Sequence, residues 1–325
     1  MRPKTHLFRL LSRTVGACDP GQTIVVSGAP RSGTTWLAEL LREWPGYKLI
    51  NEPLRLSTNP RAWAAGFDWR THVRPGEDCP ELEAHLQRIL RGEVELGPAW
   101  HFRSERLLSK LAEHVTRNRA VVKFCRAGRM LHWIAERFEG RGIVMIIRHP
   151  CAVIASMLNM GDNWQSQDVG GESLEERFEG EIPESVAREL RAIPGAADSW
   201  VGHLAIQWSL DYYFAFHGHA KGHDDYPWIL TSYERLFNEG EGELKRIVQA
   251  LGGTVNERMQ ERVGAASSFA SDDFRQDEEY QLTKWRSEFT AEQIRIILAV
   301  SAAFDLGFYT GEPFPDFGKL LPYQR

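Results

Sequence analysis

The chain has 325 residues, of which 42% are hydrophobic and 26% charged, proportions that are ordinary for a soluble globular protein. Its net charge of −5 at pH 7 argues against a general nucleic-acid-binding protein, so any anion site must be a local cationic pocket. The four cysteines are widely scattered and no histidines cluster at ligand spacing, which predicts reduced thiols rather than a disulfide framework or a zinc site.

Short apolar runs alternate along the chain with amphipathic segments. This alternation predicts an α/β fold, in which a parallel sheet is flanked by helices in three layers and ligands bind at the carboxyl ends of the strands. No change of composition suggests a linker, so we expect one domain over residues 1–325. The expected strands are 23–27, 47–50, 120–124, 142–147 and 227–231. The expected helices are 34–44, 80–91, 103–118, 129–138, 150–159 and 197–219.

The first informative motif lies between the first strand and the first helix. Gly28 and Gly33 have the spacing of a phosphate-binding loop, in which backbone N–H groups surround an anion at a helix N-terminus. The nucleotide-hydrolase form of this loop has Lys after the second Gly, but here that position is Thr34 and the cation is Arg31. This favours, over ATP, a ligand whose single 5′-phosphate carries another group such as sulfate. The alternative is a plain glycine turn, which gives no reason for the other residues.

Residues 30–37, Pro-Arg-Ser-Gly-Thr-Thr-Trp-Leu, resemble the 5′-phosphosulfate loop of the sulfotransferases that use 3′-phosphoadenosine 5′-phosphosulfate (PAPS). The resemblance implies a P-loop nucleotide-hydrolase-like fold, PAPS as cofactor and transfer of a sulfuryl group to an acceptor hydroxyl. It also implies that Arg31 acts in catalysis. A sulfuryl group carries one net negative charge, so no metal is expected. The cofactor-binding residues implied in this loop are Arg31, Ser32, Gly33, Thr34, Thr35 and Trp36.

Glu52 directly follows the second predicted strand and precedes Pro53. A carboxylate at this position is held at the ligand edge of a parallel sheet. Carbohydrate and tyrosine sulfotransferases have a Glu in the same region, and by this resemblance Glu52 is the candidate general base for the acceptor hydroxyl. The alternative is a structural ion pair with Arg31 or Arg55.

Two basic residues lie near the carboxyl ends of the third and fourth predicted strands. Lys123 stands where the family places a basic residue near the sulfuryl group, and by resemblance it is catalytic. The cytosolic members have a catalytic His two residues later, where this chain has Cys125, so the base must come from elsewhere. Arg148 and Ser156 have the spacing of the family's 3′-phosphate element, and Arg suits phosphate oxygens. The alternative is an Arg at the sheet edge beside a buried Ser.

The fifth strand is followed by Tyr233, in a segment similar to the family's Tyr-Glu-Asp-Leu element with Arg235 in place of Asp. The resemblance places this ring near the adenine, and plain packing is the alternative. Residues 284–290 resemble the family's Trp-Lys-Asn-x-Phe-Thr, but the Arg-Lys-Gly that grips the 3′-phosphate in cytosolic members is missing. Lys284 and Arg286 are the candidates to replace it.

The sequence also predicts features of the acceptor and its site. The Glu-Pro element favours a carbohydrate or another aliphatic alcohol as the small-molecule acceptor. Residues 160–196, rich in Gly, Glu and Pro, predict an insertion that is either a lid over the acceptor or a disordered surface loop. Several aromatic residues lie in segments that the family resemblance does not cover, and they either line the acceptor site or belong to the core. They are Trp63, Phe67, Trp69, Trp100, Phe102 and Trp164.

Two other functions remain open, a P-loop kinase or nucleotide hydrolase and a non-catalytic nucleotide-binding module. His149 is the other titrating group near the predicted site, and we expect it to pack against the helix that follows. No stretch is apolar over the ~20 residues that a membrane span needs. Golgi members of the family carry such an anchor, so the expectation is a cytoplasmic protein. The oligomeric state is left open.

Overall fold

Five parallel strands form one sheet in the order β2-β3-β1-β4-β5 in the computed structural model. Each predicted strand is confirmed, with boundaries that agree within about one residue. The strands are β1 (Ile24–Ser27), β2 (Tyr47–Asn51), β3 (Arg119–Phe124), β4 (Gly142–Ile147) and β5 (Trp228–Ser232). The structure describes residues 17–57, 59–68, 71–93, 112–113, 115–125, 127–159, 178, 180–218, 226–265 and 278–323.

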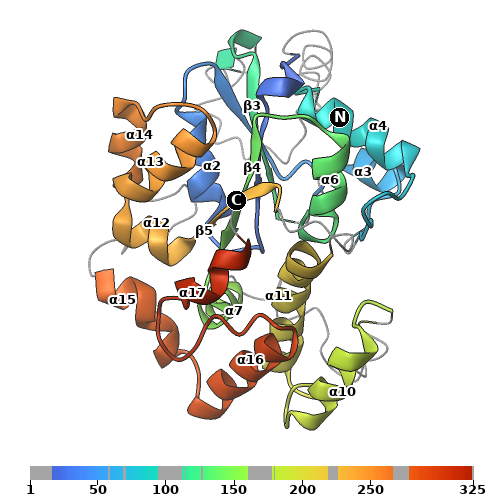
Figure 1. The fold of residues 1–325 in the computed structure, drawn as a ribbon, viewed down its shortest axis with the longest axis vertical. Coiled ribbons are helices and arrows are strands. Elements are labelled where there is room, and N and C mark those ends of the chain that lie inside the picture. Colours follow the sequence, from blue (N-terminus) through green and yellow to red (C-terminus); the bar gives the residue numbers. More distant parts are fainter. Residues whose placement is uncertain are drawn as a thin grey trace, which may run out of the picture.

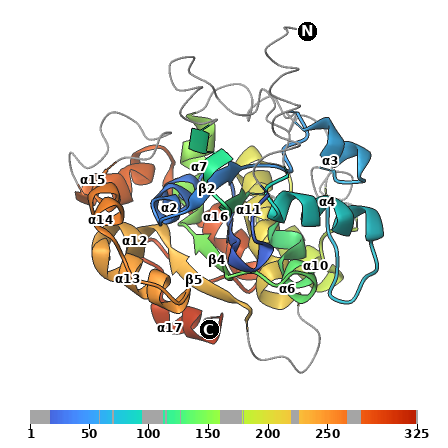
Figure 2. The same cartoon turned by 90° about the horizontal axis from the view of Figure 1, so that it is seen from above.

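Helices cover both faces of this sheet, which explains why most strand residues on either face are apolar. In β1, Ile24 and Val26 point into the apolar cluster of one face and Val25 into that of the other, since successive strand residues alternate. Figure 1 and Figure 2 show α12, α13 and α14 on one side of the sheet and α4 and α6 on the other. The first layer contains α2 (Thr34–Arg42), α12 (Tyr233–Glu239), α13 (Glu241–Ala250) and α14 (Glu257–Val263). The opposite layer contains α3 (Pro60–Ala64), α4 (Pro80–Leu90) and α6 (Leu131–Arg137).

A further group of helices packs together below the sheet in Figure 1, with α11 in contact with both α7 and α16. The predicted helices 150–159 and 197–219 are confirmed as α7 and α11, whereas most of 103–118 lies outside the described residues. This group consists of α7 (Pro150–Leu158), α10 (Glu184–Ala192), α11 (Trp200–His217) and α16 (Ala291–Ala303). The short elements are η1 (Pro20–Gln22), η3 (Gly128–Met130), α15 (Glu278–Thr283), η4 (Lys284–Ser287), α17 (Phe317–Leu320) and η5 (Leu321–Tyr323).

Part of the predicted insertion 160–196 is ordered structure. Its residues 184–192 form α10, which packs against α16 and buries Leu190 completely. The disordered-loop alternative is therefore wrong for this part, while 160–177 and 179 lie outside the described residues. The single domain over 1–325 remains a prediction. Among the residues described, no helix is both long and apolar enough to cross a membrane.

The strand order determines where a ligand can bind. The chain leaves β1 into α2 on one face of the sheet, and it leaves the neighbouring β3 into α6 on the other face. Such a topological switch point is where open α/β sheets bind ligands, at the carboxyl ends of the strands. The fold is thus a P-loop-like three-layer sandwich, and the loops after β1 and β3 flank its ligand-binding edge.

Candidate anion-binding site

The loop between β1 and α2 is held tightly against its surroundings. A Cβ atom on Gly28 would lie 2.3 Å from the carbonyl oxygen of Ile146 in β4, so only glycine allows this approach. Gly33 caps α2 with φ of 89°, and its Cβ would lie 2.7 Å from the ring of Tyr233. Arg31 also has a left-handed backbone with φ of 70°, which is uncommon for a residue other than glycine. Gly33 has no side chain with which to cap α2, and the first turn of α2 has no acidic residue, so this helix N-terminus is suited to an anion.

The structure brings the two predicted phosphate elements into direct contact. Arg31 Nε donates to Ser156 Oγ at 3.0 Å, and Arg148 Nη1 donates to the carbonyl oxygen of Arg31 at 3.0 Å. In the described part of the chain, no carboxylate lies within 4.0 Å of either guanidinium. Burial and the neighbouring charge of Arg148 lower the pKa of Arg31. Among the residues that the structure describes, these two cations lie close together and their hydrogen-bond partners are neutral, an arrangement that attracts an anion.

Glu52, Lys123 and Cys125 form a second group at the ends of β2 and β3. Lys123 Nζ lies 2.8 Å from Glu52 Oε1, and the backbone N–H of Cys125 donates to Glu52 Oε1 at 3.0 Å. The thiol of Cys125 lies 3.3 Å from Thr34 Oγ1, which links this group to the first turn of α2. The side chains of Lys123 and Glu52 are only 7% and 14% exposed. The alternative prediction was an ion pair of Glu52 with Arg31 or Arg55, and this choice of partner is wrong. Glu52 pairs with Lys123 from the adjacent strand.

The ionisation of this group follows from its packing. Burial by itself raises the pKa of Glu52, but the Lys123 ammonium and the hydrogen bonds from Cys125 outweigh burial and hold that pKa below its usual range. Burial lowers the pKa of Lys123, but Cys125 and Glu52 outweigh it and raise that pKa overall. Burial and Glu52 raise the pKa of the Cys125 thiol to about 12. At neutral pH the group is a carboxylate, an ammonium ion and a neutral thiol, and a neutral thiol is a poor nucleophile.

The aromatic residues of the two nucleotide elements pack beneath the loop. Tyr233 is buried, its ring centroid lies 5.7 Å from that of Trp36, and it stacks on Phe237 at 5.9 Å. The guanidinium of Arg148 lies over the Tyr233 ring, 4.0 Å from its centroid. Thr35, in the first turn of α2, is partly exposed. Tyr233 is thus part of the floor that supports Gly33 and Arg148.

Each of the two candidate replacements for the missing 3′-phosphate grip has a partner within the protein. Lys284 Nζ donates to Gln281 Oε1 at 3.0 Å. Arg286 donates to the carbonyl oxygen of Gly311 at 2.6 Å and lies 3.5 Å from the carboxylate of Glu312. A phosphate would have to compete with these partners for either cation.

The side chain of His149 is held by packing and by hydrogen bonds at both ring nitrogens. Its ring stacks on Trp285 at 4.3 Å, Nδ1 accepts from the backbone N–H of Cys151, and Nε2 donates to the carbonyl oxygen of Thr310 at 2.9 Å. Its own backbone N–H donates to Glu234, a buried carboxyl group that the sequence patterns did not single out. Burial lowers the pKa of His149 to about 4, so the ring is neutral. His149 therefore packs at the start of the following helix, as expected, and its ring connects the end of β4 to the C-terminal segment.

Tyr212 of α11 contacts the loop directly, although the sequence analysis did not identify it. Its hydroxyl accepts from the backbone N–H of Ala29 at 3.0 Å, lies 2.8 Å from Ser32 Oγ, and donates to the carbonyl oxygen of Ile146 at 3.1 Å. Tyr212 and Ser32 are completely buried. The predicted helix 197–219 contained Tyr212, but no spacing in that apolar segment marks one residue as facing a loop some 180 residues away.

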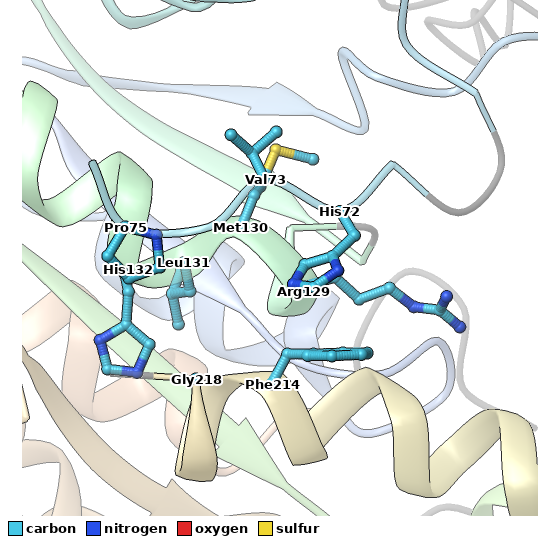
Figure 3. Close-up of a pocket in the computed structure, with 9 residues that line it drawn as sticks. All are labelled: His72, Val73, Pro75, Arg129, Met130, Leu131, His132, Phe214 and Gly218. Carbon is cyan, nitrogen blue, oxygen red and sulfur yellow. The ribbon is translucent and has the colours of Figure 1, made fainter. Parts of the chain in front are cut away.

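The candidate acceptor-site aromatics divide into core and surface. Phe67 is buried and Trp63 is 62% exposed. A small pocket with room for about one water molecule lies between η3, α6 and α11 (Figure 3). His72 and Phe214 line it with ring centroids 4.0 Å apart, and no residue of the phosphate elements reaches it. Trp69, Trp100, Phe102 and Trp164 lie outside the described residues.

A family model described as "Sulfotransferase family" matches residues 23–257. The sulfotransferase domain of the Synechococcus PCC 7002 olefin synthase is 17% identical, with a TM-score of 0.44 over 86% of this chain and 94% of that one. The sulfotransferase domain of the curacin biosynthetic pathway is 16% identical, with a TM-score of 0.43 over 87% and 96%. Mouse sulfotransferase SULT7A1 complexed with PAP is 16% identical, with a TM-score of 0.41 over 93% of each chain. No curated protein sequence matches the chain.

Proposed function

The chain belongs to the sulfotransferase family, and from this premise we propose that it transfers a sulfuryl group from PAPS to an acceptor hydroxyl. The favoured acceptor is a carbohydrate or another aliphatic alcohol. The observation that supports the proposal best is the contact of Arg31 with Ser156 and of Arg148 with the Arg31 carbonyl. These contacts join two cationic elements at one helix N-terminus, which suits a ligand with two phosphate groups.

In the proposed reaction, the acceptor oxygen forms a bond to sulfur while the bond from sulfur to the 5′-phosphate oxygen breaks. The acceptor proton passes to Glu52, and 3′-phosphoadenosine 5′-phosphate (PAP) is the leaving product. Arg31, Lys123 and the N–H groups that begin α2 stabilise the charge that develops on the leaving oxygen. The protein contributes placement and charge rather than a covalent intermediate, as in phosphoryl transfer.

The remaining proposed contacts follow the two anion subsites. The 5′-phosphosulfate lies against Arg31 and the backbone N–H groups of Gly33, Thr34 and Thr35. The 3′-phosphate lies against Arg148 and Ser156. Tyr233 and Trp36 support the loop from below, so their proposed role is to shape the nucleotide site. Lys284 and Arg286 remain candidates for the 3′-phosphate, and binding would require them to exchange the partners that they have in this structure.

A ligand test distinguishes this function from a kinase or nucleotide hydrolase. We expect PAP to raise the melting temperature in EDTA, whereas ATP with Mg²⁺ has little effect, because the site offers two cationic subsites but no P-loop lysine after Gly33. Thermal-shift titration measures both. Stabilisation by ATP with Mg²⁺ but not by PAP would overturn the proposed function.

A second prediction concerns Arg148. The change Arg148→Gln is expected to weaken PAP binding by about 1.5–3 kcal/mol, because it removes a charged hydrogen-bond donor, and to leave adenosine 5′-phosphosulfate binding nearly unchanged. Isothermal titration calorimetry measures both affinities. Arg141 at the opposite end of β4 is a matched control, since its guanidinium also stacks on an aromatic ring, 4.2 Å from Trp44. Equal losses with both nucleotides in Arg148→Gln would assign Arg148 to the support of the loop instead.

A further inference from the structure

The hydroxyl of Tyr212 connects three parts of the anion-binding edge. It contacts Ala29 near the start of the loop, Ser32 in its middle, and Ile146 in β4, two residues before Arg148. Aromatic packing does not require this hydroxyl, because Trp208 and Phe216 contact the Tyr212 ring itself. A phenylalanine would fill the same space. The function of the oxygen atom therefore lies in its hydrogen bonds.

The direction of each hydrogen bond follows from a count of protons. A tyrosine hydroxyl has one proton to donate and two lone pairs to accept with. The backbone N–H of Ala29 can only donate, and the carbonyl oxygen of Ile146 can only accept, so the Tyr212 proton goes to Ile146. Ser32 must then donate its hydroxyl proton to Tyr212. Burial raises the pKa of Tyr212, so its proton stays in place at neutral pH.

Ser32 therefore has no donor left for a ligand. Its hydroxyl donates to Tyr212 and its backbone N–H donates to the carbonyl oxygen of Ala29 at 3.1 Å. The residue is 0% exposed, so its side chain does not reach the surface of the loop. Although Ser32 lies in the middle of a phosphate-binding motif, it faces the protein interior.

We propose that Tyr212 is a positioning residue for the 5′-anion subsite, and that Ser32 contacts Tyr212 instead of the ligand. Tyr212 holds the loop so that the N–H groups of Gly33, Thr34 and Thr35 face the ligand. Because the same hydroxyl binds β4 just before Arg148, it also sets the separation of the two anion subsites. This inference rests on the proposed function, in which the 5′-phosphosulfate occupies the loop.

The test compares Tyr212→Phe with Tyr226→Phe. Tyr226 is a matched control, because it is another buried tyrosine whose hydroxyl forms a hydrogen bond to the backbone. The Tyr226 hydroxyl donates at 2.8 Å to the carbonyl oxygen of Phe216, which lies in α11 like Tyr212. Binding of PAP and of adenosine 3′-monophosphate, which lacks the 5′-phosphate, is measured by calorimetry. In Tyr212→Phe we expect the Kd for PAP to rise about tenfold and the Kd for adenosine 3′-monophosphate to change less than about twofold. Tyr226→Phe is expected to leave both values unchanged.

Equal losses for both ligands in Tyr212→Phe, or no loss for PAP, would overturn the positioning role. Ser32→Ala keeps two of the three hydrogen bonds of the Tyr212 hydroxyl, those to Ala29 and Ile146. It provides a second variant if Tyr212→Phe does not fold. It is expected to raise the Kd for PAP by at most about threefold, and a larger rise would show that the Ser32 hydroxyl contacts the ligand. The wild type is measured first. If it does not bind PAP, the proposed function itself fails, whereas failure of the inference requires a wild type that binds PAP.

Discussion

Replacement of Glu52 by glutamine is expected to lower turnover about 10²–10⁴-fold while the affinity for PAP changes little. Glutamine has the size of glutamate and its oxygen can still accept from the backbone N–H of Cys125, but it cannot take a proton from the acceptor hydroxyl. The loss should therefore appear in kcat rather than in cofactor binding. Steady-state kinetics and calorimetry with PAP measure the two quantities separately.

The same change also removes the counter-charge of Lys123, so the melting temperature is expected to fall. Glu39→Gln is the control for this effect, because Glu39 is a largely buried carboxylate that pairs with Arg262 away from the sheet edge. It should lower the melting temperature without a comparable loss of turnover. A folded Glu52→Gln protein with near-native turnover would leave Glu52 only the role of holding Lys123.

The pH dependence of catalysis provides an independent measure of Glu52. The pKa of Glu52 lies below the usual value of 4.5. Glu52 is therefore an ionised carboxylate, able to accept a proton, at neutral pH and at every pH down to 4.5. If Glu52 is the base, activity falls only as pH drops through this lowered pKa, and an acid limb of kcat/KM near pH 6 would point to another group. The stabilisation that Glu52 provides is likewise present above pH 4.5 and is lost as pH falls through the pKa of the folded state.

Lys123→Met is expected to lower kcat about 10²–10³-fold, the loss that follows removal of one donor that stabilises developing charge in a transition state. Methionine has a similar length without the ammonium group. The control is Lys48→Met, because Lys48 is an almost fully buried lysine on the adjacent strand β2, three residues before the carboxyl end of that strand. Lys48→Met should reduce stability but not turnover.

Lys123→Met leaves Glu52 buried without its cation, so this variant is also expected to lose stability. The double variant Glu52→Gln, Lys123→Met removes both charges and should be more stable than either single variant, although it remains inactive. Chemical denaturation and single-turnover kinetics with PAPS measure the two effects. Near-native kcat in Lys123→Met would exclude the proposed role of its ammonium group.

The residues differ in how much of their role could be predicted from sequence. The phosphate elements around Arg31 and Arg148 were recognisable because each follows a continuous apolar run, and β1 and β4 proved to be neighbours. The partner of Glu52 was not predictable, because it depends on strand order. Only the pairing of β2 with β3, with Asn51 opposite Lys123, brings these two charges together. Tyr212 acts through one oxygen atom on an apolar helix, where the hydrophobic pattern carries no information about a distant loop.

The pair of guanidinium groups at Arg31 and Arg148 has a consequence for how this protein can change. Like charges that lie this close repel each other, and the repulsion lowers the stability of the ligand-free fold. A substitution that relieves this repulsion would be favoured by any selection or screen for heat resistance alone, and it would weaken the anion site. Stability and ligand affinity therefore place opposite demands on the same two side chains, and thermostabilised variants need both arginines kept unchanged.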